Sequence, residues 1–155
     1  MATLVASCGG EPPAKLNTGD TAPAFKTVQL DGAPVDFPAA YAGKPVVLRF
    51  WADWCKYCEG EMKIIDTVWQ RHAPSGLTIL AVNAGQDKDT VAAFMQKLGV
   101  GYTAAMDESS AIARRYGVVG LPTTYLIDGQ GIVRGKIVGE ADAAMFERHV
   151  QALLK

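Results

Sequence analysis

Two cysteines separated by two residues, Cys55 and Cys58, are the most distinctive chemical feature of the chain. They follow an apolar run over residues 46–51, which predicts a buried strand, and they open a predicted helix. A thiol at a helix N-terminus lies at the positive end of the helix dipole, which lowers its pKa and favours the nucleophilic thiolate. A second cysteine one turn further on can close a disulfide with the first, so the pattern indicates thiol–disulfide exchange.

Metal binding is the alternative chemistry for such a cysteine pair. A structural zinc site would need two more ligands, and the sequence offers only Cys8, His72 and His149, with no second CxxC. Cu(I) is better suited to soft thiolates, and Met62 is near in sequence. The redox interpretation predicts no metal and no cofactor beyond the cysteine disulfide. A non-enzymatic Cu(I)-binding module stays open as the alternative.

Composition sets the limits of the function. The chain has 155 residues, 49% of them apolar and 20% charged, with a formal net charge of −1, as expected for one globular domain. No basic block suggests nucleic acid, and no apolar run approaches the ~20 residues that span a membrane. We expect a monomer that binds no nucleic acid.

The first 18 residues are small, polar and rich in Gly and Pro, which predicts a disordered leader or tether before a domain over residues 19–155. The string over residues 4–10 resembles a bacterial lipobox, in which Cys8 would carry a lipid anchor. Only seven residues precede Cys8, too few for a complete signal peptide. Either the signal has been trimmed or Cys8 is an ordinary free thiol.

Hydrophobic periodicity predicts strands that alternate with helices. This order predicts an α/β fold with a mixed central sheet covered on both faces. The expected elements are a hairpin over residues 25–30 and 35–37, strands at 46–51, 77–82, 102–106, 123–127 and 132–138, and helices at 56–72, 89–98, 109–116 and 141–154.

A second motif lies far downstream, where Leu121, Pro122 and Thr123 open a predicted strand. A Trp-Cys-x-x-Cys after one strand and a proline before a later one, followed by a hairpin and a helix, resembles the thioredoxin superfamily. The resemblance implies a cis Pro122 that faces the disulfide. It also implies that Leu121 offers its backbone to an extended substrate, as in strand addition, with Trp54 and Thr123 beside it.

The resemblance narrows to the TlpA/ResA-like branch through the N-terminal hairpin, the helix–strand insertion at residues 89–106 and the segment at 121–128. It implies an extracytoplasmic, membrane-anchored thiol-disulfide oxidoreductase that acts on protein disulfides, for example in cytochrome c or copper-centre maturation. The sequence has no nucleotide or flavin fingerprint, so a membrane reductase or another thioredoxin would have to recharge it.

Four residues around the cysteines would tune them. The branch carries a glutamate at the position of Glu61, linked to thiol proton transfer, whereas Arg49 departs from thioredoxin, which has a buried aspartate there. An isolated buried arginine is costly, so we expect Arg49 to pair with Glu61; the alternative is that Arg49 reaches solvent. Lys56 should favour the neighbouring thiolate and make the disulfide more oxidising, and isomerases also place a tyrosine at the position of Tyr57.

The sequence therefore predicts an enzyme in which Cys55 attacks a substrate disulfide and Cys58 resolves the mixed disulfide, helped by Glu61 or water. A disulfide oxidase or isomerase would use the same residues and differ in redox potential. A thiol peroxidase is a further alternative, which the Trp54 before the first cysteine fits poorly.

Overall fold

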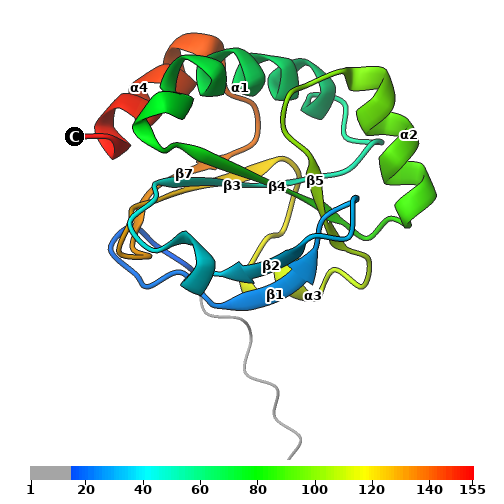
Figure 1. Ribbon diagram of the computed structural model, residues 1–155, viewed down its shortest axis with the longest axis horizontal. Coiled ribbons are helices and arrows are strands. Elements are labelled where there is room, and N and C mark those ends of the chain that lie inside the picture. Colours follow the sequence, from blue (N-terminus) through cyan, green and yellow to red (C-terminus); the bar gives the residue numbers. More distant parts are fainter. Residues whose placement is uncertain (1–14) are drawn as a thin grey trace, which may run out of the picture.

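The computed structural model describes residues 15–155, which fold around a five-stranded sheet (Figure 1). Its strands are β3 (Val46–Trp51), β4 (Thr78–Ala84), β5 (Ala104–Asp107), β6 (Thr123–Ile127) and β7 (Val133–Val138). They lie in the order β5-β4-β3-β6-β7. Strands β3, β4 and β5 are parallel, while β6 and β7 are each antiparallel to the strand before them in the sheet. The predicted mixed sheet is confirmed.

The remaining elements cover the two faces of this sheet. They are the hairpin strands β1 (Phe25–Val28) and β2 (Pro34–Phe37), the 3-10 turns η1 (Ala39–Tyr41) and η2 (Ala73–Ser75), and the helices α1 (Cys58–His72), α2 (Lys88–Leu98), α3 (Ala111–Arg115) and α4 (Ala143–Leu153). Helices α1, α2 and α4 lie on one face, and the hairpin with α3 lies on the other (Figure 1).

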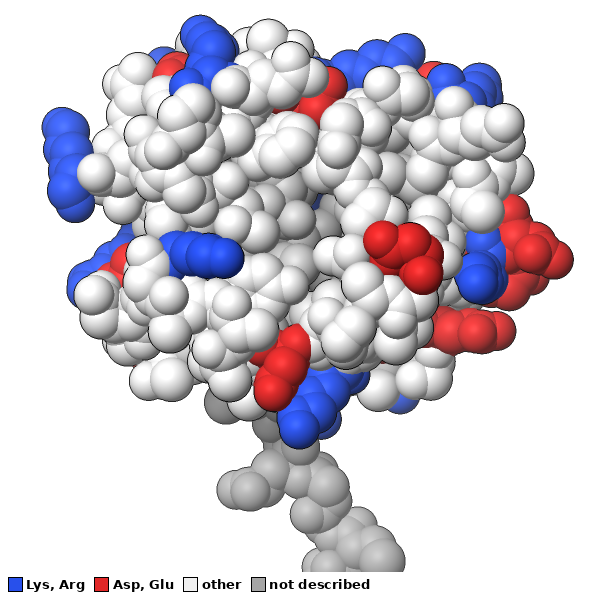
Figure 2. Space-filling model, in the orientation of Figure 1, with Lys and Arg blue, Asp and Glu red and all other residues white. Residues whose placement is uncertain are grey.

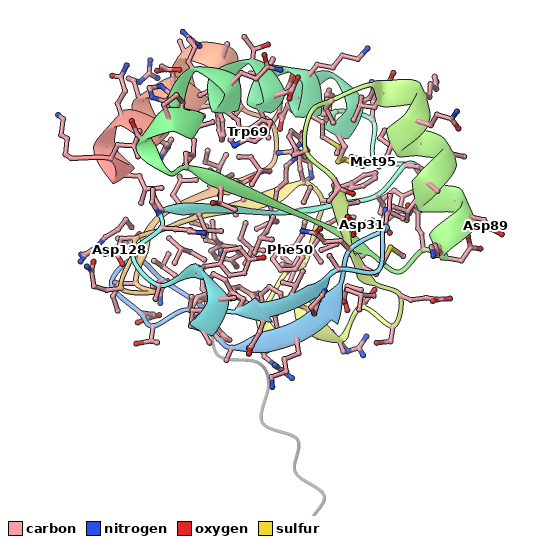
Figure 3. The ribbon with its side chains drawn as sticks, viewed as in Figure 1. Asp31, Phe50, Trp69, Asp89, Met95 and Asp128 are labelled. Carbon is pink, nitrogen blue, oxygen red and sulfur yellow. A yellow bond between two sulfur atoms is a disulfide. The ribbon has the colours of Figure 1, made fainter. Side chains whose placement is uncertain are left out.

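Each face of the sheet has its own hydrophobic core, because alternate strand residues point to opposite sides. Val47 and Trp51 of β3 face the helices, whereas Leu48 and Phe50 face the hairpin. Figure 3 shows Phe50 in the layer between sheet and hairpin and Trp69 of α1 on the helix side. All six residues of β3 are buried, so the strand that leads into the cysteine pair lies at the centre of the molecule.

Several element boundaries differ by a few residues from the sequence predictions, and two differences show how the chain folds. Asp87, not Asp89, caps helix α2: its extended backbone lets the carboxylate accept a hydrogen bond from the Thr90 N–H at 2.8 Å. Leu16, inside the predicted leader, is 7% exposed and packs in the hairpin-side core. The folded part of the chain therefore includes Leu16.

The surface carries interspersed charges. On the face seen in Figure 2, acidic and basic side chains lie among each other without a large patch of one sign. Among residues 15–155, no helix combines the length and the apolar character needed to cross a membrane.

Candidate active site at the cysteine pair

Cys55, in the loop after β3, forms a disulfide with Cys58, the first residue of α1, and their Cα atoms are 5.4 Å apart. Helix α1 begins at Cys58, not at Lys56 as predicted, and turns precede it at Asp53-Trp54 and at Lys56-Tyr57. Cys55 therefore precedes the helix, and its carbonyl accepts a hydrogen bond from the Cys58 N–H at 3.1 Å. The pair still lies at the N-terminal end of α1.

The two sulfur-bearing residues differ in their exposure to solvent. Cys55 is 7% exposed and Cys58 is fully buried, so an external reactant can reach only the first. Beside them, Trp54 is 70% exposed and Tyr57 is 46% exposed. The ammonium of Lys56 lies 5.5 Å from the centre of the Tyr57 ring, a cation–π arrangement. Exposed aromatic side chains next to a nucleophile are typical of a contact surface.

The proline loop, residues 118–122 before β6, has the backbone geometry that the resemblance implied. The Leu121–Pro122 peptide bond is cis. Pro122 is buried and Leu121 is half-buried, and the carbonyl of Pro122 accepts from the Gly139 N–H at 2.8 Å. Thr123 is 2% exposed and its hydroxyl donates to the Gly120 carbonyl at 2.7 Å. The Thr123 side chain thus braces this loop from inside.

A groove of about 240 Å³ connects the two loops. Its walls come from the cysteine loop, the end of β4, helix α3 and the proline loop, and its lining is mostly apolar. The lining residues are Trp54, Ala84, Ser110, Ala113, Arg114, Val118, Val119, Gly120 and Leu121. Val119 is 97% exposed, which is unusual for a branched apolar side chain outside a contact surface. Sequence reasoning found Trp54 and Leu121 and missed the α3 wall.

One helical turn after Cys58, Glu61 of α1 pairs with Arg49 of β3, which confirms the predicted contact. The guanidinium Nη2 lies 2.8 Å from Glu61 Oε2, and both side chains are more than nine-tenths buried. Arg49 Nη1 donates to the Thr124 hydroxyl at 3.1 Å, and the other oxygen of Glu61 accepts from the Ala141 N–H at 2.6 Å. Burial lowers the pKa of Arg49, and the Glu61 carboxylate acts against that shift.

The Arg49–Glu61 pair connects the walls of the site. Arg49 lies on the central strand, Thr124 lies two residues after the cis proline, and Ala141 follows Gly139, whose N–H is bonded to Pro122. These contacts tie helix α1, strand β6 and the loop after β7 together. The alternative in which Arg49 reaches solvent is wrong.

Other candidate positions fall away from this site or outside the described residues. Cys8 lies outside the described residues. His72 lies near the end of α1, 2.5 Å from a carboxylate oxygen of Glu147, and His149 lies on α4. Within residues 15–155, no group of three or more His, Cys, Asp or Glu side chains is placed to hold a metal ion.

The comparisons with known proteins agree with this geometry. A family model described as the AhpC/TSA family matches residues 18–136. The chain belongs to this family. Thiol-disulfide oxidoreductase ResA of Geobacillus kaustophilus is 36% identical over 135 residues, which cover 87% of this chain and 77% of that protein.

Solved structures of thiol-disulfide oxidoreductases share the fold of this chain. A candidate thiol:disulfide interchange protein DsbE from Chlorobium tepidum matches with a TM-score of 0.85 and 30% identity, over 91% of this chain and 100% of the other. A secreted disulfide oxidoreductase of Mycobacterium tuberculosis, described as homologous to E. coli DsbE, matches with a TM-score of 0.74 and 26% identity, over 83% and 96% of the two chains. The thioredoxin-like fold and the ResA-like resemblance are confirmed, and the reaction class of the enzyme is thiol–disulfide oxidoreduction.

Proposed function

We propose that this oxidoreductase works as a reductant of protein disulfides outside the cytoplasm. The observation that carries the proposal is the asymmetry of the cysteine pair: the partly accessible Cys55 directly follows Trp54, which lines the apolar groove, whereas Cys58 is fully buried. An attacking thiol must reach its substrate, whereas a resolving thiol needs to reach only its partner.

The reaction would begin from the reduced dithiol. The Cys55 thiolate attacks one sulfur of a substrate disulfide, forms a mixed disulfide, and releases the other substrate sulfur as a thiolate, which takes up a proton. Cys58 loses its proton to water or to Glu61, and its sulfur then attacks the Cys55 sulfur. The Cys55–Cys58 disulfide forms, and the substrate leaves with two thiols, having gained two electrons.

Substrate binding is assigned to the surface around Cys55. An extended substrate segment would pair with the backbone of Leu121, next to the cis Pro122, while its side chains enter the groove between Trp54 and Val119. Apolar substrate side chains fit this lining, because burial against Trp54 and Val119 removes apolar surface from water on both partners.

The cellular setting of the proposal follows from the relatives and from the N-terminal sequence. One matched structure is described as secreted, and Cys8 stands in a lipobox-like string that suits a lipid anchor. Maturation of cytochrome c or of a copper centre is the proposed context. The proposal includes no cofactor beyond the disulfide, a monomer, and a membrane reductase or another thioredoxin as the source of electrons.

Covalent trapping tests this function. A Cys58→Ala variant cannot resolve mixed disulfides, so we expect it to accumulate covalent adducts with envelope proteins, and these adducts should disappear on treatment with dithiothreitol. A Cys55→Ala variant is the matched control and should trap none. Equal trapping by the two variants would contradict the assignment of attacking and resolving roles.

Disulfide oxidase or isomerase activity is the second candidate, and Lys56 favours it. A cation next to Cys55 stabilises the thiolate of the reduced state and makes the disulfide more oxidising. Equilibration with glutathione separates the two functions. A reductant stays oxidised in all but strongly reducing mixtures, whereas an oxidase is reduced by glutathione readily. Tight Cu(I) binding with slow disulfide exchange would instead support the non-enzymatic alternative.

A further inference from the structure

A hydrogen-bonded clamp holds the loop just before Cys55. The backbone N–H of Asp53 donates to Gln86 Oε1 at 2.8 Å, and Gln86 Nε2 donates in return to the Asp53 carboxylate. One glutamine therefore binds both the backbone and the side chain of Asp53. The two residues are 33 positions apart in sequence, and Gln86 belongs to the loop between β4 and α2.

Gln86 is itself anchored from the interior. Asn83, fully buried at the end of β4, donates its side-chain N–H to Gln86 Oε1 at 2.9 Å. Asn83 pairs in register with Trp51, the last residue of β3. A buried amide that donates a hydrogen bond is held in one orientation, because rotation would turn its buried donor away from its acceptor. The clamp thus transfers the rigidity of the sheet to a surface loop.

The clamped segment carries the residues that meet a substrate. Asp53 and Trp54 form the turn that is closed by a 3.3 Å hydrogen bond from the Cys55 N–H to the Ala52 carbonyl. Trp54 is 70% exposed, so its own packing contributes little to fixing this turn. Cys55 follows Trp54 in the chain, and Asp53 precedes it. The contact between Asp53 and Gln86 therefore holds the N-terminal end of the turn.

We propose that Gln86 is a positioning residue for substrate docking, acting through Asp53 to set the placement of Trp54 at the groove. This inference rests on the proposed function in taking Trp54 as a substrate contact. It predicts that loss of the clamp weakens the reaction with substrates large enough to touch Trp54. A small disulfide that needs only the Cys55 sulfur should react nearly as before.

The first test replaces Gln86 by Met, which keeps the length of the side chain and removes its hydrogen bonds. For the reduced protein, we expect the second-order rate constant with a disulfide-bonded peptide rich in apolar residues to fall about tenfold, the effect of one or two lost hydrogen bonds. The rate constant with the small aromatic disulfide of Ellman's reagent should stay within about twofold of the parent. A circular dichroism spectrum equal to that of the parent shows that the variant is folded.

Gln70→Met is the matched control. Gln70 donates a hydrogen bond of 2.9 Å to Asp66 on the surface of α1, so the same substitution removes the same kind of contact away from the site. Its rate constants with both substrates should equal those of the parent.

A swap of donor and acceptor tests the contact itself. Gln86→Glu keeps the acceptor for the Asp53 N–H but sets two carboxylates against each other, so the peptide reaction should again slow. Adding Asp53→Asn restores a side-chain hydrogen bond with its direction reversed, and the peptide rate constant should recover. A loss of general packing would not recover in this way.

Three results would overturn the inference: Gln86→Met behaving like Gln70→Met, equal losses with peptide and small disulfide, or no recovery in the double variant. A Trp54→Ala variant separates this inference from the function on which it rests. If Trp54→Ala leaves the peptide reaction unchanged, the docking role of Trp54 fails and the clamp fails with it. If Trp54→Ala slows that reaction and Gln86→Met does not, only the clamp fails.

Discussion

Helix α1 is held by ion pairs at both of its ends, in very different surroundings. In its first turn, Glu61 meets Arg49, and the two side chains are 6% and 2% exposed. In its last turn, Arg71 and His72 both contact Glu147 of α4, at 3.0 Å and 2.5 Å, and the Arg71 side chain is 58% exposed. The first pair lies in the helical turn that begins at Cys58, and the second cluster joins two helices at the surface.

The difference lies in what replaces the contact when it breaks. Water can solvate Arg71 when the contact breaks, although the Glu147 side chain is only 18% exposed, so this pair at the surface adds only ~0.2–1 kcal/mol to stability. Arg49 and Glu61 have no such substitute, and removal of one partner leaves a buried charge uncompensated. The chain therefore fixes the cysteine end of α1 far more firmly than the other end, which is where thiol chemistry needs a constant geometry.

The largest expected effect is on the buried pair. Arg49→Met removes the cation and leaves Glu61 buried beside apolar residues, so the free energy of unfolding should fall by ~3–5 kcal/mol. Urea denaturation of the oxidised protein measures it. Lys63→Met is the control: it removes a cation from the exposed Lys63–Glu59 pair on the same helix, 3.9 Å apart, and should change stability by less than ~0.5 kcal/mol. Similar losses in both variants would refute the contrast.

The second effect is smaller and concerns the pair as a unit. A double variant, Arg49→Met with Glu61→Leu, removes both charges and leaves mainly the Ala141 N–H without its acceptor, at a cost of ~1–3 kcal/mol. We expect the double variant to be more stable than Arg49→Met alone. If the two losses instead add, the side chains do not act as a pair and the buried end of α1 is held by something else.

The buried pair was within reach of sequence reasoning, whereas the surface contacts were not. A cation inside a continuous apolar strand demands a partner, and Glu61 was the acidic residue on the helix face above it. Strand and helix positions followed from periodicity, and the site followed from two motifs with fixed places in one fold. These features are local in sequence or shared by a family, so they can be read before the structure is known.

The clamp at Gln86 carried no comparable signal. Polar residues in loops are common, and nothing local distinguishes a glutamine that reaches across to Asp53 from one that faces solvent. The prediction of the α2 cap was wrong for a related reason. Asp87 and Asp89 are both suitable capping residues, and only the extended backbone at Asp87 decides between them. Such choices depend on the tertiary path of the chain.

The third effect concerns the exposed cluster and its pH dependence. The hydrogen bond with His72 is the main cause that holds the pKa of Glu147 below its ordinary value of 4.5. The hydrogen bond from Gln151 and the positive charge of Arg71 lower it further. A carboxylate with a lowered pKa in the folded state stabilises the protein above its unfolded pKa, and that contribution is lost as the pH falls through the folded pKa. Glu147→Gln should lower stability at neutral pH by ~0.5–1 kcal/mol.

Measurement of unfolding from neutral pH down to about pH 3 checks this sign. The difference in free energy of unfolding between the parent and Glu147→Gln should shrink below the ordinary carboxyl range, because both proteins are then uncharged at position 147. A difference that widens below the ordinary carboxyl range would mean that Glu147 is stabilised in its protonated form, contrary to the contacts with Arg71 and His72.

The smallest expected effect is a difference in salt dependence between the ion pairs at the two ends of α1. Salt at about 1 M shortens the Debye length to ~3 Å, so it screens the exposed cluster but hardly reaches a pair enclosed by protein. The loss caused by Glu147→Gln should therefore decrease by a few tenths of a kcal/mol between low and high salt, while the loss caused by Arg49→Met stays constant. Salt also changes the stability of the parent, so each variant is compared with the parent at the same concentration. A salt-dependent loss for Arg49→Met would show that solvent ions reach the Arg49–Glu61 pair and that the cysteine end of α1 is as open as the other.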